Sequence, residues 1–234
     1  NLNASLSTST PGITITDANE ALGNLAAGAS ITLNNAFGIS IAESIADATL
    51  AEFNILMQSG TESWNHPFTL EINAPNLCYG DFSISDPTGN NNAKLDPGET
   101  ANLIIPILNN GAAISPGGFT VISSPTPGVS IASPTQFFSP ISAGSSECLT
   151  FSICADVSIP AGTLAFFSLS SSAGAYTAEH SIQLEVGEPE IISIGSGSSS
   201  QSYPLDRYYN YSVHEAIYLA DEINALGSIS AIAY

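Results

Sequence analysis

The chain has almost no basic side chains. Lys94 and Arg207 are the only two among 234 residues, whereas 21 residues are acidic, and the formal net charge is −19. Nucleic acids and anionic membrane surfaces are usually bound through clustered Lys and Arg, so this composition argues against both as partners. Divalent cations are the partners that such a charge attracts.

Long apolar runs and cysteines are also scarce. No segment approaches the roughly 18 consecutive apolar residues of a membrane span, which argues against membrane insertion. No signal peptide is recognisable, so a secreted form of this sequence would be a mature or excised segment. Three cysteines do not suffice for a disulfide framework. If one strand holds Cys148 and Cys154, they lie too far apart to bond mutually; either one pairs with Cys78, or the thiols are buried and free.

Small polar and turn-forming residues dominate instead. The chain is 44% hydrophobic but only 10% charged, and Ser, Thr, Asn, Gly and Pro supply most of the rest. This composition is typical of short strands joined by frequent turns. Its length suits about two β-sandwiches of roughly 100 residues each, so we expect an all-β fold.

The chain contains an internal repeat. Thr10–Ile15 matches Thr126–Ile131, and Ala27-Gly28 then matches Ala143-Gly144 in the same register. A slip of two residues follows. The anchors after the slip are Phe37 with Phe151, Thr49-Leu50 with Thr163-Leu164, Phe53 with Phe167, His66 with His180, Glu71 with Glu185 and Pro75 with Pro189.

Each copy predicts an immunoglobulin-like sandwich. Phe151–Val157 and Ser181–Val186 alternate apolar and polar residues, as half-buried strands do, and Pro-Gly and Ala-Gly pairs punctuate both copies. Two sheets packed face to face would bury the apolar rows. We therefore expect tandem immunoglobulin-like β-sandwiches at residues 1–76 and 77–190, followed by a C-terminal extension at 191–234.

The two copies are unequal. The second opens near Leu77 with a strand, a polar loop and another strand, Ala101–Leu108, and nothing in the first copy corresponds to them. By this self-alignment the first copy starts about forty residues late. We expect its sandwich to lack the opening strands and to expose a hydrophobic groove with unpaired edges.

Two segments resemble modules of known proteins. Asp86–Thr100, followed by an apolar strand and Asn109-Asn110-Gly111, resembles the immunoglobulin-like repeats of large secreted Bacteroidetes-type surface proteins, which often follow gingipain-type peptidase domains. Tyr203–Ser212 and Ile217–Ile223 resemble the opening strands of adhesin-like modules in the same proteins. The resemblance implies secretion, by a type IX route, and an extracellular or cell-surface location. It does not imply peptidase activity, because no α/β catalytic domain is visible in this sequence.

The acidic loop is the candidate metal site. With Glu99 as the twelfth position, the loop follows an EF-hand-like ladder of oxygen ligands that suits Ca²⁺. Thr88 replaces the usual first ligand, for which Asp86 is a substitute, and Ala93 replaces the usual glycine. The alternative is an Asx-rich turn without metal. The predicted ligands are Asp86, Asn90, Asn92, Lys94 through its carbonyl, Asp96 and Glu99.

Catalysis is not expected. His66 and His180 share one repeat position, which favours a shared structural role. Gly195-Ser196-Gly197 approaches a nucleophile elbow only in part and has no strand-to-helix context. We predict that the protein is not an enzyme.

The extension carries the candidate partner-binding residues. Three roles are open for its aromatic side chains: stacking on sugars, binding a partner protein, or packing within the extension itself. Ser228–Tyr234 alternates like a strand. The candidates are Tyr203, Tyr208, Tyr209, Tyr211, Ile217, Tyr218, Ile229 and Ile232.

Three functions fit these observations. In the first, the extension of one subunit fills the groove of the next, and an extracellular filament forms by donor-strand complementation. In the second, the chain is a stalk or adhesin segment of a larger surface protein or peptidase, and the missing strands lie upstream. In the third, it is an adhesin that binds glycans.

Overall fold

The computed structural model describes residues 1–188. The regular secondary structure of these residues consists entirely of β-strands. The predicted all-β fold is confirmed. The described residues include no helix that is long and apolar enough to cross a membrane. The predictions made for residues 191–234 lie outside the described part of the chain.

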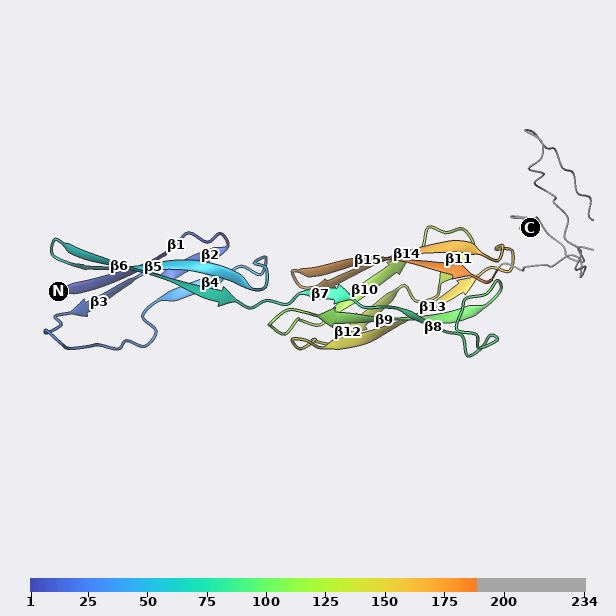
Figure 1. Ribbon diagram of the computed structural model, residues 1–234, viewed down its shortest axis with the longest axis horizontal. Helices are drawn as coiled ribbons and strands as arrows, with labels where there is room; N and C mark the ends of the chain where they lie inside the picture. Colours follow the sequence, from blue (N-terminus) through green and yellow to red (C-terminus); the bar gives the residue numbers. More distant parts are fainter. Residues whose placement is uncertain (189–234) are drawn as a thin grey trace, which may run out of the picture. The chain divides into compact units, whose positions relative to one another are not determined.

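The front module, residues 1–76, contains six strands. Four of them form an antiparallel sheet in the order β3-β1-β5-β6, and the other two form a separate antiparallel pair, β2-β4 (Figure 1). The strands are β1 (Leu2–Thr8), β2 (Ile13–Asp17), β3 (Asn19–Gly23), β4 (Gly38–Ile41), β5 (Thr49–Ser59) and β6 (Glu62–Ile72).

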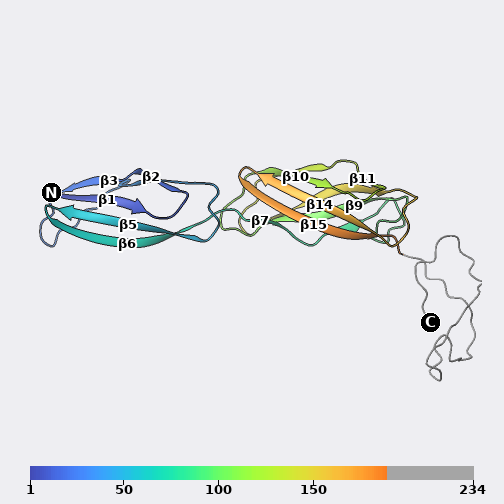
Figure 2. The same cartoon turned by 90° about the horizontal axis from the view of Figure 1, so that it is seen from above.

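The second module, residues 77–188, contains nine strands. One sheet has the order β12-β10-β14-β15; the other has the order β11-β13-β9-β7, with β8 also paired to β9. Figure 1 labels all nine strands, and Figure 2 shows the module from above. The strands are β7 (Leu77–Tyr79), β8 (Ser83–Ser85), β9 (Thr100–Asn109), β10 (Gly118–Ser123), β11 (Val129–Ile131), β12 (Thr135–Phe138), β13 (Ser146–Ala155), β14 (Thr163–Ala173) and β15 (Tyr176–Val186).

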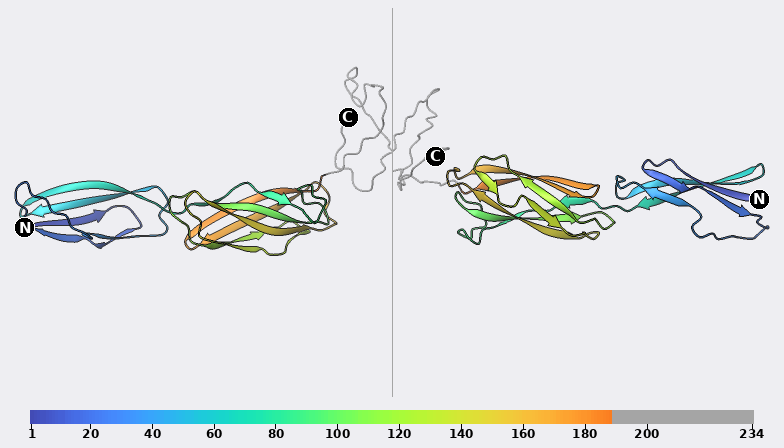
Figure 3. Two further views of the ribbon diagram at one scale, coloured as in Figure 1. Left: turned by 90° about the horizontal axis from the view of Figure 1, so that it is seen from below. Right: turned by 180° about the vertical axis from the view of Figure 1, so that it is seen from behind.

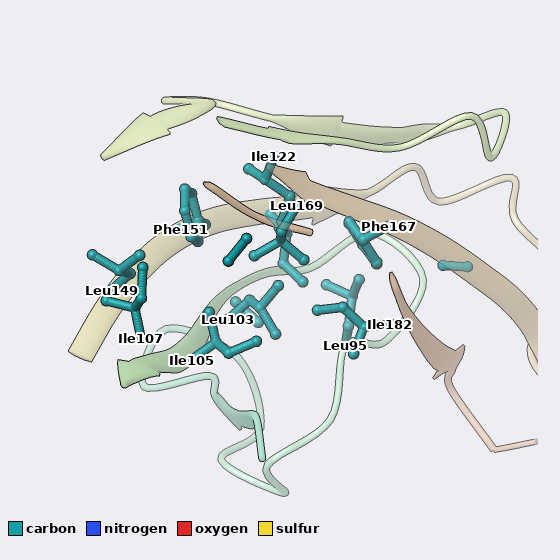
Figure 4. Close-up of a cluster of buried hydrophobic side chains, with 14 of the residues drawn as sticks. Leu95, Leu103, Ile105, Ile107, Ile122, Leu149, Phe151, Phe167, Leu169 and Ile182 are labelled. Carbon is teal, nitrogen blue, oxygen red and sulfur yellow. The ribbon is translucent and has the colours of Figure 1, made fainter. Parts of the chain in front are cut away.

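Each module has its own hydrophobic core. In the second module, alternate residues of β9, β13 and β14 bury their side chains between the two sheets (Figure 4). The core cluster of the front module contains far fewer buried side chains: Leu6, Ile13, Ala51, Phe53 and Ile72. Full burial of an aliphatic or aromatic side chain contributes about 1.5–3 kcal/mol, so the front core stabilises its module much less.

The turns that follow β1 and β10 form equivalent hydrogen bonds. In the front module, the amide of Glu52 donates to Thr10 Oγ1 over 2.8 Å. In the second, the amide of Phe166 donates to Thr126 Oγ1 over 2.9 Å. Both threonines begin the Thr-Pro-Gly motif of the repeat. The two modules can therefore be compared strand by strand, and Figure 3 shows them from two further sides.

This comparison explains a strained residue in the front module. Ala48 has a φ of 58°, and the glycine at the equivalent position, Gly162, has a φ of 85°. Only glycine adopts positive φ without a steric cost. The front module therefore has the same turn conformation, with alanine in place of glycine.

We expect Ala48→Gly to raise the free energy of unfolding by about 0.5–1 kcal/mol, because it relieves this clash. The control is Ala132→Gly, at an exposed position without positive φ, which should lower stability by a similar amount. Chemical denaturation measures both. A loss of stability in both variants would contradict the assignment of strain to Ala48.

The carboxylate of Asp47 binds the chain that follows β6. It accepts hydrogen bonds from the amide of Ala74 over 2.7 Å and from the amide of Ala112 over 3.2 Å. These two bonds, the one from Ala74 first, hold the pKa of Asp47 below its ordinary value of 3.8. Desolvation opposes them.

A lowered pKa in the folded state means that Asp47 stabilises the fold above its ordinary pKa. This contribution is lost as the pH falls through the folded-state pKa. The native chain should therefore melt above an Asp47→Asn variant at neutral pH, and the difference should shrink below about pH 3.8. Melting temperatures across that range test this. A difference that does not change with pH would contradict it.

Candidate functional site

Strand β4 has a free edge in the described structure. Ile13 lies opposite Ile41 in the β2-β4 pair, as Val129 lies opposite Ala155 in the β11-β13 pair. Strand β4 therefore corresponds to the last part of β13. β13 also pairs with β9 along its other edge, whereas among residues 1–188 the only partner of β4 is β2.

The side chains beside this edge are uncovered. Ile39 is 38% exposed and Ile41 is 42% exposed, whereas their counterparts Ile153 and Ala155 are both fully buried, at 0%. The difference follows from β9, which covers β13 in the second module. Nothing in the described front module takes its place, as the sequence predicted.

The chain before β4 also lacks the structure of its counterpart. β13 begins at Ser146, but the matching residues before Gly38 form no strand. Leu25, which precedes this stretch, is 44% exposed, and its counterpart Ile141 is 3% exposed. Without a neighbouring strand, the backbone before Gly38 has no partner for β-sheet hydrogen bonds.

The inner face of β6 is open because the described front module also has no counterpart of β7. In the second module, the ring of Tyr79 on β7 stacks on His180 of β15, with centroids 5.5 Å apart. The counterpart of His180 is His66, which stacks instead on Phe68 of its own strand at 6.5 Å. Both histidines therefore pack against aromatic rings, at the same repeat position.

We call this region the open groove. Its residues are large and apolar, and each of them is exposed or only partly buried. Exposed apolar surface of this kind marks interaction sites in soluble proteins, and an unpaired edge invites another strand. The groove consists of Leu25, Ile31, Leu33, Phe37, Ile39, Ile41, Trp64, Phe68 and Leu70.

The second module contains a buried polar group that the sequence did not reveal. The hydroxyl of Tyr79 is 2.5 Å from Ser171 Oγ, which is 2.5 Å from Thr120 Oγ1. Burial raises the pKa of the Tyr79 hydroxyl, and its hydrogen bonds to Ser171 and Thr120 oppose that shift. These residues lie far apart in the sequence on three strands, so no local pattern predicts their contact.

The residues of the predicted calcium site lie together in the loop between β8 and β9. Asp86 is buried, and its carboxylate accepts the amides of Asn92 at 3.1 Å and Ala93 at 2.9 Å. Asp96 Oδ2 accepts the side-chain amides of Asn90 at 2.7 Å and Asn92 at 2.8 Å. The loop thus forms the network of an Asx-rich turn.

Two further residues complete the loop. Glu99 accepts the backbone amide of Asn90 over 3.2 Å, and the Lys94 ammonium forms an ion pair with Glu188. Ala93 has a φ of 62°, so it adopts the left-handed turn for which an EF-hand loop uses glycine. Within residues 1–188, no three His, Cys, Asp or Glu side chains converge as metal ligands do. Calcium binding remains a prediction.

If calcium binds this loop, Ca²⁺ at one hundred times its dissociation constant should stabilise the chain by about 2.7 kcal/mol. Glu99→Gln should abolish the effect, because it removes the closing carboxylate. Asp81→Asn, an exposed site outside the loop, should not. Thermal unfolding with and without Ca²⁺ measures this, and an unchanged melting temperature of the native chain would contradict calcium binding.

The cysteines and the partner-binding residues complete the comparison with the sequence. Cys78, Cys148 and Cys154 are all free, so the alternative in which Cys78 forms a disulfide is wrong. The thiols are free, as the other alternative predicted, but none of them is fully buried. All three lie on outward-facing positions of their strands. The eight candidate partner-binding residues from Tyr203 to Ile232 lie outside the described residues.

Comparisons with known proteins give no family. No protein-family model and no curated protein matches this chain. One similar solved structure is the ASH / PapD-like domain of human CEP192 (PapD-like domain 7). The match has 13% sequence identity and a TM-score of 0.31, and it covers 49% of this chain and 87% of that one.

Proposed function

We propose that this chain is a non-catalytic extracellular structural protein whose subunits polymerise head to tail by β-strand complementation. The observation that carries the proposal is the free edge of β4 beside the open groove. In the second module, the same edge of β13 is filled by β9. A strand from residues 189–234 of another copy would fill it in the front module.

The physical gain from such an insertion is large. An added strand pairs its backbone groups with β4 and covers the exposed side chains of Ile39 and Ile41. Each Ile or Leu that becomes fully buried contributes about 1.5–3 kcal/mol. Ordering the inserted segment costs part of this, on the order of 2–5 kcal/mol. With many apolar side chains in the groove, burial exceeds that cost.

The geometry of the contact favours a filament over a closed pair. The groove and the extension are different surfaces of one subunit, so the interface is heterologous. A heterologous contact that does not close into a ring propagates into a fibre. A role on the cell surface or outside the cell suits a chain with only two basic residues, because trypsin-like proteases find almost no cleavage sites.

A stalk or adhesin segment of a larger surface protein is the second candidate. The observation that favours it is the strand order, since β7, β8 and β9 all precede β10 along the chain. Counterparts supplied by the same polypeptide would therefore precede Leu2, the first residue of β1. An intact mass of the native protein far above 24.0 kDa would support this candidate.

Electron microscopy and light scattering of the purified chain test the filament. We expect fibres from the full chain and monomers from a chain that lacks residues 189–234. Ile39→Asp should also abolish fibres, because it places an unpaired charge at the covered edge. The matched control is Ile114→Asp, at an exposed position of the second module, which should leave fibres intact.

Thermal unfolding establishes that each variant is folded. Fibres that persist after removal of residues 189–234 would overturn the proposal. So would a full chain that stays monomeric at all concentrations.

A further inference from the structure

Several side chains at the open groove are larger than the side chains at the matching positions of the second module. Three of them belong to the groove, and the fourth, Met57, lies beside it on β5. Trp64, for example, is 49% exposed where the second module has Ala178 at 8%. The four pairs are Trp64 with Ala178, Met57 with Ser171, Phe68 with Ile182 and Ile41 with Ala155.

Protein interiors are packed to the density of organic crystals, so a larger side chain on one wall leaves room for a smaller one opposite. In the second module the space is filled from β9 by Leu103, Ile105 and Ile107, all buried. A strand that occupies the open groove must therefore carry smaller residues on its inner face than β9 does.

The groove also lacks side chains that could form a hydrogen bond with a buried hydroxyl. Ser171 and Thr120, which hold the hydroxyl of Tyr79 in the second module, correspond to Met57 and Ala4 in the front module. A hydroxyl brought to this place would lose its water without gaining a hydrogen bond, at a cost of about 1–3 kcal/mol. The occupant should therefore place no tyrosine hydroxyl beside Met57 and Ala4.

Charge restricts the occupant further. Residues 1–76 contain no Lys or Arg, so a carboxylate inserted into the groove would find no cation. Burial of an unpaired charge is strongly unfavourable. The occupant should be uncharged along the length that β13 uses to pair with β9, from Ser146 to Cys154.

Only one part of residues 189–234 meets all of these conditions. Residues 191–205 are uncharged, but their centre is a run of Gly and Ser, and residues 206–222 contain both acidic and basic side chains. Residues 223–234 are uncharged, and every odd-numbered position holds a small or aliphatic residue: Ile223, Ala225, Gly227, Ile229, Ala231 and Ala233.

We propose that residues 223–234 of a second copy pair antiparallel with β4 in the place of β9, with their odd-numbered side chains facing the core. This inference rests on the proposed strand complementation and names its donor and its orientation. Ile229 then faces inward, whereas Ile232 and the hydroxyl of Tyr234 face outward. The tyrosines from Tyr203 to Tyr218 remain outside the groove.

Bulky substitutions in the full chain test the inner face. Ala231→Trp should slow fibre growth at least tenfold, because the narrowed groove cannot admit the ring. The matched control, Ser230→Trp, places the same ring on the outer face and should polymerise at the native rate. Light scattering during assembly measures both rates.

Disulfide trapping tests the orientation. The three native cysteines are replaced by serine, and Ser40→Cys is introduced at the position equivalent to Cys154, which faces outward opposite Thr100. Combined with Ser228→Cys or Ser230→Cys, it should give covalent multimers on non-reducing gels. Combined with Ala231→Cys, whose side chain faces inward, it should give none.

The outcomes separate the two proposals. If the native chain forms fibres but Ala231→Trp assembles like Ser230→Trp, or only Ala231→Cys is trapped, another donor segment or the opposite face is used. The donor assignment is then overturned and strand complementation stands. If the native chain forms no fibres, both proposals are overturned.

Discussion

The pairing of β13 with β9 is the interaction on which the architecture depends. β9 is the strand of its sheet that contacts β13, β7 and β8 together, and its inner residues Ile105 and Ile107 are completely buried. It closes the ladder of β13 and covers Ile153. In the front module the described residues include no such strand. The exposed residues of β4 and the missing first half of the β13 counterpart follow from this difference. The open inner face of β6 follows from the absence of a counterpart to β7, the neighbour of β9.

The front module nevertheless retains a defined structure, because its larger sheet does not need the missing strand. β5 pairs with β1 on one side and with β6 along its full length on the other. Phe53 on β5 stacks on Phe68 of β6 with ring centroids 5.4 Å apart. The module is therefore a stable sheet with an incomplete second layer. Such an arrangement is preorganised to accept a strand, since binding does not have to form the receiving sheet.

Much of this fold was predictable from the sequence because its signals are local. The Thr-Pro-Gly turns and the alternation of strands such as β13 depend on neighbouring residues, and the repeat then transfers one module's strands to the other. The loss of strand structure before Gly38 was not predictable, because strand formation there depends on a partner distant in sequence. The same holds for Tyr79, Ser171 and Thr120. In the acidic loop the ladder of oxygen ligands was visible, but not that Asp86 would be buried beneath backbone amides.

In the proposed filament, the divergence of the two modules would also make assembly specific. A repeat protein with one open groove risks filling it with the wrong strand, and β9 of a partly unfolded neighbour is the nearest alternative in sequence. Met57 and Trp64 are larger than their counterparts Ser171 and Ala178, so they would leave less space for the bulky inner face of β9. The front module also has no counterparts of the Ser171 and Thr120 hydroxyls that bind Tyr79. Both changes act against the strands of the second module and leave small aliphatic faces unaffected. Specificity is a difference between two affinities, so walls that reject one strand contribute as much as walls that attract the other.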